Sequence, residues 1–159
     1  MTSSVDYLFD SIKKGDNVYR IEALLEMNPD LVNCKSSNGF TPLIYTAYMG
    51  NVTLTEIILK HKAEIDMQDA MGNTALMGVC FKGNDTIARL LLDCGADINA
   101  RNNNGHTALI MASKYDNSNI IKLLLEHGAD KSIIDNEGNS ANDYAEQKGL
   151  KEIVELLRQ

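Results

Sequence analysis

The stretch GFTPLIYTAYMGN, residues 39–51, decides the fold of this chain. Thr41 followed by Pro42 predicts a helix start, because threonine caps free backbone N–H groups and proline fits the first helical position. Gly50 predicts the helix end, since glycine adopts left-handed backbone angles without a Cβ clash. A helix of about nine residues is only marginally stable alone in water. The stretch therefore requires a neighbour that packs against it.

The same stretch returns at a spacing of 33 residues. It reads GNTALMGVCFKGN at 72–84, GHTALIMASKYDN at 105–117 and, more loosely, GNSANDYAEQKGL at 138–150. Leucine-rich runs recur in the same register, as LTEIILK, IARLLLD and IIKLLLE. Each unit thus predicts a turn, a short helix, a second turn, a second short helix and a loop. Because neither helix can bury its apolar face alone, the copies must stack into a continuous core.

The repeated residues resemble the ankyrin repeat. The resemblance is carried by Asp69–Leu76 and Leu90–Ala100, with matching copies at Gly39–Leu43 and Leu123–Asp130, and it extends from about Asp6 to Arg158. It implies an all-α solenoid of stacked helix-turn-helix units with projecting β-turn or hairpin tips. It also implies a concave groove, formed by those tips and by the first helix of each unit.

We expect a single ankyrin-repeat domain over residues 1–159, with a capping repeat at each end. Polar side chains crowd both ends, as an array needs on its outermost faces. The ends therefore predict a complete small protein rather than a fragment of a longer array. The expected units are 1–35 (N-terminal capping repeat), 36–68, 69–101, 102–134 and 135–159 (C-terminal capping repeat).

Some positions depart from the family pattern. Lys62 stands where Gly95 and Gly128 follow the second helix, and Asp116 stands where a glycine ends the first helix. A left-handed backbone costs a lysine about 1 kcal/mol relative to glycine. We therefore expect Lys62→Gly to be neutral or stabilising. The histidine common after Thr-Pro-Leu is missing with its hydrogen bonds across the turn, and its place is taken by Ile44, Met77, Ile110 and Asp143.

Composition excludes several classes of protein. The net charge of −7 argues against a nucleic-acid partner, which needs a basic surface. The apolar runs are too short to span a membrane, and the first residues do not resemble a secretory signal. The odd cysteine count indicates free thiols at Cys34, Cys80 and Cys94, and hence a location in the cytoplasm. Cys80 shares a small-residue position with Ala47 and Ser113, where we expect a buried substitute for alanine.

No catalytic or metal-binding pattern stands out. His61, His106 and His127 lack the spacing of metal ligands, and there is no phosphate loop or nucleophile motif. Cys94 is interpreted as an ordinary, partly exposed thiol. We expect no catalytic residue, no metal and no cofactor.

In the absence of catalytic motifs, the candidate functional feature is a binding surface. Packed helices lie about 8–10 Å apart, so Tyr48, Phe81 and Tyr115 are expected to form an aromatic line along the groove. The alternative is that these rings pack against the turn of the next unit. Large apolar and cationic side chains surround them, a composition typical of interfaces except for the lysines. The predicted partner-binding residues are Phe40, Tyr48, Met49, Met71, Asn73, Phe81, Lys82, His106, Lys114 and Tyr115.

The sequence therefore favours a non-enzymatic protein–protein interaction module that binds a protein partner through its groove and turn tips. An alternative is a stoichiometric inhibitor or regulatory subunit that covers the site of an enzyme or toxin. A structural array without a ligand is disfavoured by the irregular turns. We expect a monomer, with neither nucleic acid nor membrane as a partner.

Overall fold

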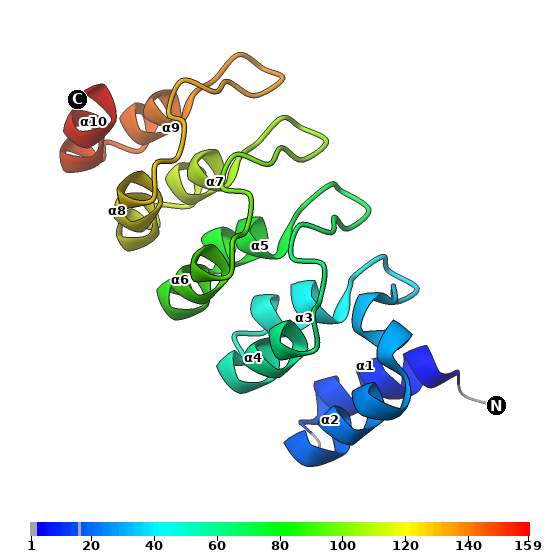
Figure 1. Cartoon of the computed structure of the whole chain (residues 1–159). Helices are drawn as coiled ribbons and strands as arrows, with labels where there is room; N and C mark the ends of the chain where they lie inside the picture. The colour runs from blue at the N-terminus through cyan, green and yellow to red at the C-terminus, as the bar shows by residue number, and fades with distance from the viewer. Residues whose placement is uncertain (1–2, 16) are drawn as a thin grey trace.

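The computed structural model describes residues 3–15 and 17–159, and over these ranges the chain is helical with no named strand (Figure 1). Short helices follow one another in pairs. They are α1 (Ser4–Lys14), α2 (Val18–Met27), the 3-10 helix η1 (Pro29–Asn33), α3 (Pro42–Tyr48), α4 (Val52–Lys60), α5 (Ala75–Lys82), α6 (Asp85–Asp93), α7 (Ala108–Lys114), α8 (Ser118–Glu126), α9 (Ala141–Gln147) and α10 (Lys151–Arg158).

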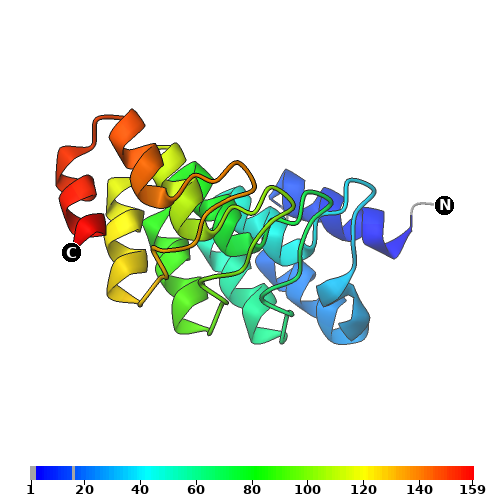
Figure 2. The same ribbon diagram turned by 90° about the horizontal axis from the view of Figure 1, so that it is seen from above.

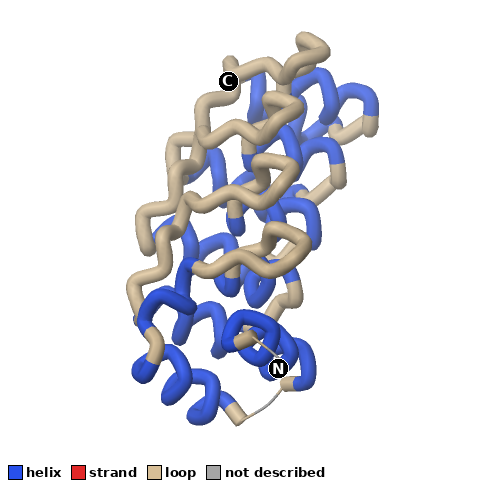
Figure 3. Tube along the Cα trace, turned by 90° about the vertical axis from the view of Figure 1, so that its right-hand side faces the viewer, coloured by secondary structure: helices blue, strands red, loops and turns tan. Residues whose placement is uncertain are grey.

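The helices stack in two rows, with the two ends of the chain at opposite ends of the stack (Figures 1 and 2). Helices α3, α5, α7 and α9 contact one another in succession, and α4, α6, α8 and α10 form the second row. The loops between units project from one side of the stack (Figure 3). The helical-repeat solenoid predicted from the 33-residue spacing is confirmed.

Each first helix starts as its sequence predicts. The side-chain oxygens of Thr41, Thr74 and Thr107 accept hydrogen bonds from the backbone N–H three residues later, at 3.1, 3.3 and 3.3 Å. Helix α3 has seven residues rather than nine, because Met49 already serves as its C-cap before Gly50 turns left-handed at φ 74°. The difference lies within the usual uncertainty of helix ends.

Both residues that stand in place of a glycine have a left-handed backbone. Lys62 has φ 63° and Asp116 has φ 59°. At the histidine position of the last unit, an aspartate forms a capping box within the first turn of α9. There Asp143 Oδ2 accepts hydrogen bonds from the backbone N–H of Ser140 at 2.7 Å and from its hydroxyl at 2.6 Å. A carboxylate in the first turn also suits the helix dipole, so this departure is locally favourable.

The core runs the length of the stack between the two rows. The small side chains of Ala47, Cys80 and Ser113 are completely buried between neighbouring first helices, as predicted. Burial raises the pKa of the Cys80 thiol, so this cysteine stays protonated and acts as a packing residue.

Side chains of three different types link neighbouring units at one repeated position. Lys35 donates to the carbonyl of Gln68 at 2.9 Å, and Gln68 donates to the carbonyl of Arg101 at 2.9 Å. Arg101 in turn donates to the carbonyl of Ile134 at 2.8 Å. Ile134 carries no donor, so this series of links stops at the last tip.

Candidate functional site

The rings of Tyr48, Phe81 and Tyr115 form a continuous row across three units. The Tyr48 and Phe81 rings are stacked, with centroids 6.2 Å apart and an interplanar angle of 7°. The Phe81 and Tyr115 rings meet edge to face at 4.5 Å and 82°. All three remain 36–44% exposed. The predicted aromatic line is therefore present, and the rings pack against one another while keeping one face in solvent.

A hollow of about 290 Å³ opens beside this row. It spans three units, because its lining includes Phe40 and Ile44 from one unit, Gly78 from the next and Met111 from a third. The position occupied by Gly78 holds Tyr45 in the unit before, Met111 in the unit after and Tyr144 in the last unit. The missing side chain at Gly78 therefore accounts for the space. The other lining residues are Tyr48, Asp69, Met71, Asn73, Thr74, Phe81 and Tyr115.

Two lysines flank the aromatic row. The Lys82 Nζ lies 4.7 Å from the centroid of the Tyr48 ring, and the Lys114 Nζ lies 5.3 Å from that of the Tyr144 ring. Cations over aromatic faces are attracted by the ring quadrupole. Among residues 3–15 and 17–159, neither lysine lies within ion-pair distance of a carboxylate. The groove thus presents positive charge on a chain with an overall charge of −7.

Asp69 closes the tip above the hollow. Its Oδ1 accepts hydrogen bonds from the backbone N–H groups of Met71 and Asn73, at 2.8 and 2.9 Å. Its Oδ2 accepts only a long bond of 3.4 Å from the Asn73 side chain, counting donors within the described residues. We call Phe40, Asp69 and Gly78 the first junction, since they bring two neighbouring units together.

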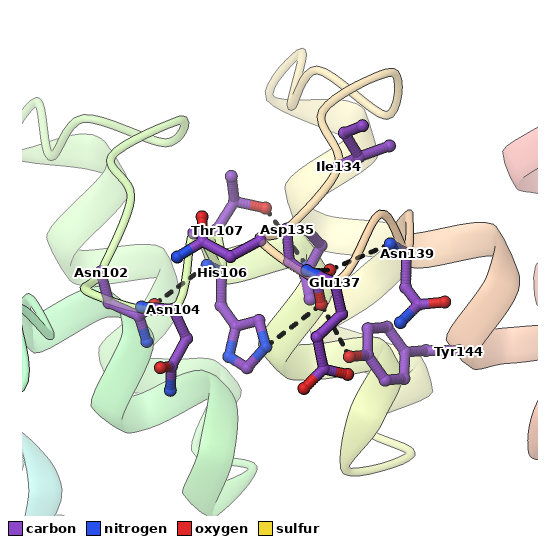
Figure 4. A network of polar contacts seen from close by, with 12 residues as sticks. Asn102, Asn104, His106, Thr107, Ile134, Asp135, Glu137, Asn139 and Tyr144 are labelled. Atoms are coloured by element: carbon purple, nitrogen blue, oxygen red, sulfur yellow. Dashed lines mark hydrogen bonds and ion pairs between the residues drawn. The ribbon is translucent and has the colours of Figure 1, made fainter.

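The equivalent residues at the last tip, His106, Asp135 and Tyr144, form the last junction (Figure 4). Asp135 Oδ1 accepts the backbone N–H groups of Glu137 and Asn139, each at 2.9 Å. Its Oδ2 accepts the Tyr144 hydroxyl at 2.7 Å and lies 3.3 Å from Nε2 of His106. Here the Tyr144 side chain extends from the position that Gly78 leaves without a side chain at the first junction.

Burial and hydrogen bonding set the protonation states of this last junction. Burial raises the pKa of Tyr144 to about 12, and the Asp135 carboxylate acts in the same direction. Burial opposes ionisation of Asp135, but hydrogen bonds from Tyr144 and from two backbone N–H groups outweigh it and lower its pKa. Burial lowers the pKa of His106, and the nearby Lys114 lowers it further against the effect of Asp135. The junction therefore holds an ionised Asp135 beside a neutral His106 and a neutral Tyr144 at neutral pH.

A family model described as ankyrin repeats, in three copies, matches residues 8–102 and again residues 79–159. The chain belongs to the ankyrin-repeat family. Ankyrin repeats are in general protein–protein interaction modules and are typically non-catalytic.

The ankyrin groove brings most of the predicted site residues together. Phe40, Tyr48, Met71, Asn73, Phe81 and Tyr115 all line the hollow, and Lys82 lies over the Tyr48 ring. Met49 is exposed at the end of α3, outside the hollow. Lys114 is half-buried over Tyr144. Their contact with a partner stays a prediction.

The sequence places His106 among the tip residues expected to face a partner, but the structure does not display its side chain. Its side chain is buried against Asp135, and its ring lies edge to face with Tyr144 at 6.2 Å. The reason is that the carboxylate and hydroxyl at this ankyrin junction supply polar partners inside the fold. The sequence reasoning also missed Asp69 and Gly78. Aligning the four units would have shown Gly78 in a column of large side chains.

Within the described ranges of this ankyrin chain, no three His, Cys, Asp or Glu side chains cluster in a way that could hold a metal ion. No helix of those ranges is both long and apolar enough to cross a membrane. The thiols of Cys34, Cys80 and Cys94 are free.

Proposed function

We propose that this ankyrin chain is a non-enzymatic module that binds a protein partner through its concave groove and turn tips. The observation that carries the proposal is the exposed row of Tyr48, Phe81 and Tyr115 beside an apolar hollow. Aromatic side chains dominate the energy of protein interfaces because they bury a large area while losing little conformational freedom. Binding by ankyrin repeats in general supports the same role.

The mechanism is recognition by a preformed surface. The helices under the three rings are held by completely buried small residues, so the rings are oriented before a partner arrives. A rigid surface loses less entropy on binding than a flexible one. We propose that the protein acts as a monomer in the cytoplasm, and its free thiols support a reducing compartment.

The proposal is tested by affinity capture from the native cell extract with mass spectrometry. Bait proteins are the wild type, the triple variant Tyr48→Ala/Phe81→Ala/Tyr115→Ala, and Tyr19→Ala as a matched control. Tyr19 lies on α2 and is 78% exposed, but it is outside the groove. We expect the triple variant to lose the partner, since truncating a central anchor costs about 2 kcal/mol or more, whereas Tyr19→Ala retains it. Equal capture by all three proteins rules out the groove.

A further inference from the structure

The hollow over Gly78 has the size of one large side chain. Its volume of about 290 Å³ lies at the lower limit of small-molecule pockets, which span about 300–1,000 Å³. It opens between the tip residue Phe40 and the exposed aromatic row, in the middle of the proposed binding groove. A partner side chain can therefore enter it from solvent.

The last junction shows which kind of side chain fits such a place. Tyr144 extends from the position equivalent to Gly78, and its hydroxyl donates to Asp135 at 2.7 Å. At the first junction Asp69 occupies the place of Asp135, and Phe40 occupies the place of His106. The carboxylate is thus present where the ring and the hydroxyl are missing.

Asp69 is short of a strong donor on one oxygen. Within the described ranges, its Oδ2 accepts only the 3.4 Å bond from Asn73, whereas the equivalent oxygen of Asp135 accepts the short bond from Tyr144. A hydroxyl that enters the hollow would make a charge-assisted hydrogen bond of the stronger class. The apolar walls around it favour an aromatic ring over an aliphatic ammonium group, which is strongly hydrated.

The charge next to the hollow favours carboxylates on either side of that ring. Lys82 lies over the wall residue Tyr48. Lys114 is the chain neighbour of the wall residue Tyr115, and its Nζ lies over Tyr144 of the last unit. Three carboxylates are also near. Asp69 is the acceptor that we assign to the partner hydroxyl, and Asp85 lines a surface depression together with Lys82 and Tyr48. Asp116 follows α7 and accepts a long hydrogen bond of 3.4 Å from the Ser118 hydroxyl. Because none of these carboxylates lies within ion-pair distance of Lys82 or Lys114 in the described ranges, an acidic partner segment can pair with both lysines.

We propose that a tyrosine of the partner protein, flanked by acidic residues, inserts into the hollow over Gly78. Its ring lies between Phe40 and the aromatic row, its hydroxyl donates to Asp69, and its acidic neighbours pair with Lys82 and Lys114. This proposal rests on the proposed function and specifies the chemistry of the partner at that site.

The probe is a library of displayed random peptides of about twelve residues, selected on the immobilised full-length chain. We expect enrichment of peptides that carry tyrosine with aspartate or glutamate nearby. Enriched peptides are then measured by fluorescence polarisation against Gly78→Met, which copies Met111 of the next unit. Filling the hollow should weaken binding at least about tenfold. Lys82→Gln/Lys114→Gln should weaken binding and reduce its dependence on salt.

A double-mutant cycle tests the hydroxyl itself. Replacing the peptide tyrosine by phenylalanine should weaken binding to the wild type about tenfold, as expected for a hydrogen bond to a charged group. The same replacement should have little effect on Asp69→Asn. Asparagine suits this position, because Asn102 closes the next tip in the same way. If replacing the peptide tyrosine weakens binding to the wild type and to Asp69→Asn equally, the proposed contact with Asp69 is wrong.

A measurement without any partner checks the geometry of the hollow. Gly78→Tyr places inside the chain the ring that we assign to the partner. It should melt higher than Gly78→Phe by about 2–4 °C, and Asp69→Asn should remove that difference. If Gly78→Tyr and Gly78→Phe have the same melting temperature while Asp69 is present, the assignment of a tyrosine to the hollow is wrong.

Other selection results also overturn the proposal: no enriched peptide, enriched peptides without tyrosine, or unchanged binding to Gly78→Met. If the chain self-associates and Gly78→Met abolishes this self-association, the occupant of the hollow is a second copy of the chain. That result also overturns the proposal. Peptides that bind Gly78→Met normally but do not bind the Tyr48→Ala/Phe81→Ala/Tyr115→Ala variant overturn the tyrosine proposal and support the proposed function. If that variant binds the selected peptides and the captured partner as well as the wild type, the proposed function fails too.

Discussion

The first and last junctions place the same carboxylate in opposite surroundings. Asp69 and Asp135 each close a tip by accepting two backbone N–H groups, with nearly equal distances. Around Asp135 the side chains of His106 and Tyr144 complete a buried network. Around Asp69, Gly78 leaves a hollow that solvent enters. The repeat thus fixes the backbone of a junction, and the side chains that it brings together from two neighbouring units decide whether the junction is buried or open.

The tips of these two junctions offer the test with the largest expected effect. Gly72 and Gly138 have nearly the same φ, at 78° and 83°. A Cβ on Gly72 would lie 2.6 Å from Asn103 Oδ1 and 2.8 Å from the Asn103 backbone nitrogen. A Cβ on Gly138 meets no atom within 4 Å among the described residues beyond its chain neighbours. Backbone strain and overpacking together should make Gly72→Ala destabilising by about 3 kcal/mol.

Gly138→Ala is the matched control, since it carries only the backbone strain of about 1 kcal/mol. Chemical denaturation of both variants measures the difference. Equal losses would mean that the tips of neighbouring units do not pack as closely as the structure places them.

The next largest effect on stability is expected from the Tyr144 hydroxyl, which is present at the last junction and absent from the first. Tyr144→Phe leaves the buried Asp135 carboxylate without its shortest donor and should destabilise the protein by about 2 kcal/mol. Tyr45 is the control, because it occupies the same column and no hydrogen bond of its hydroxyl is found among the described residues. Tyr45→Phe should change the free energy of unfolding by less than about 0.5 kcal/mol. Similar losses in both variants would argue against the network.

A smaller effect is expected from the protonation of His106. Its pKa is lowered in the folded state, mainly by burial and then by Lys114. The unfolded chain therefore binds a proton more readily, and stability present above about pH 6.5 declines as the pH falls below that value. His106→Asn, which copies Asn73 at the same column, should reduce this decline.

The measurement is chemical denaturation at about pH 7.5 and about pH 5.5, where histidine changes its charge. The loss of stability between the two pH values is compared for the wild type and His106→Asn. His61 and His127 are present in both proteins, so their contribution cancels. An identical loss in both proteins would show that His106 titrates as it does in the unfolded chain.

The sequence predicts the backbone of these junctions far better than their side chains. The 33-residue spacing, the threonine caps and the left-handed Lys62 and Asp116 follow from local rules that any unit obeys. The aromatic row follows as well, because residues at one column of a regular array must be neighbours. The division into units at residues 36, 69, 102 and 135 stays a prediction.

The side-chain environment of the site depends on pairs of columns instead. His106 looks like a displayed tip residue until Asp135 and Tyr144 of the following unit are placed beside it. Likewise the hollow exists only because Gly78 faces Phe40 from another unit. Reading one column at a time cannot show such contacts, since each joins residues about one repeat apart.

The loops that follow the second helices allow a comparison of backbone strain alone, at Lys62 and at Gly95. Lys62 and Gly95 share one column and both have positive φ, at 63° and 87°. Beyond its chain neighbours, a Cβ on Gly95 meets no described atom within 4 Å, so a substitution there tests the backbone conformation alone. Lys62→Gly should stabilise the protein by about 1 kcal/mol, and Gly95→Lys should destabilise it by a similar amount. Thermal melting measures both, and a clearly lower melting temperature for Lys62→Gly would contradict the argument.

Gly78→Ala is the smallest change and bears most directly on why the first junction is open. Gly78 lies inside α5, where glycine is less favourable than alanine by about 0.5–1 kcal/mol. Outside its chain neighbours and the backbone of α5, a Cβ there meets Tyr48 Cδ2 at 3.7 Å among the described residues, which is ordinary contact. Alanine should therefore raise the free energy of unfolding by that amount while its methyl group begins to fill the hollow. If stability rises and partner binding weakens, the glycine keeps a binding site open at the expense of stability. If stability does not rise, Gly78 has a structural role in α5, and the contrast between an open and a closed junction loses its basis.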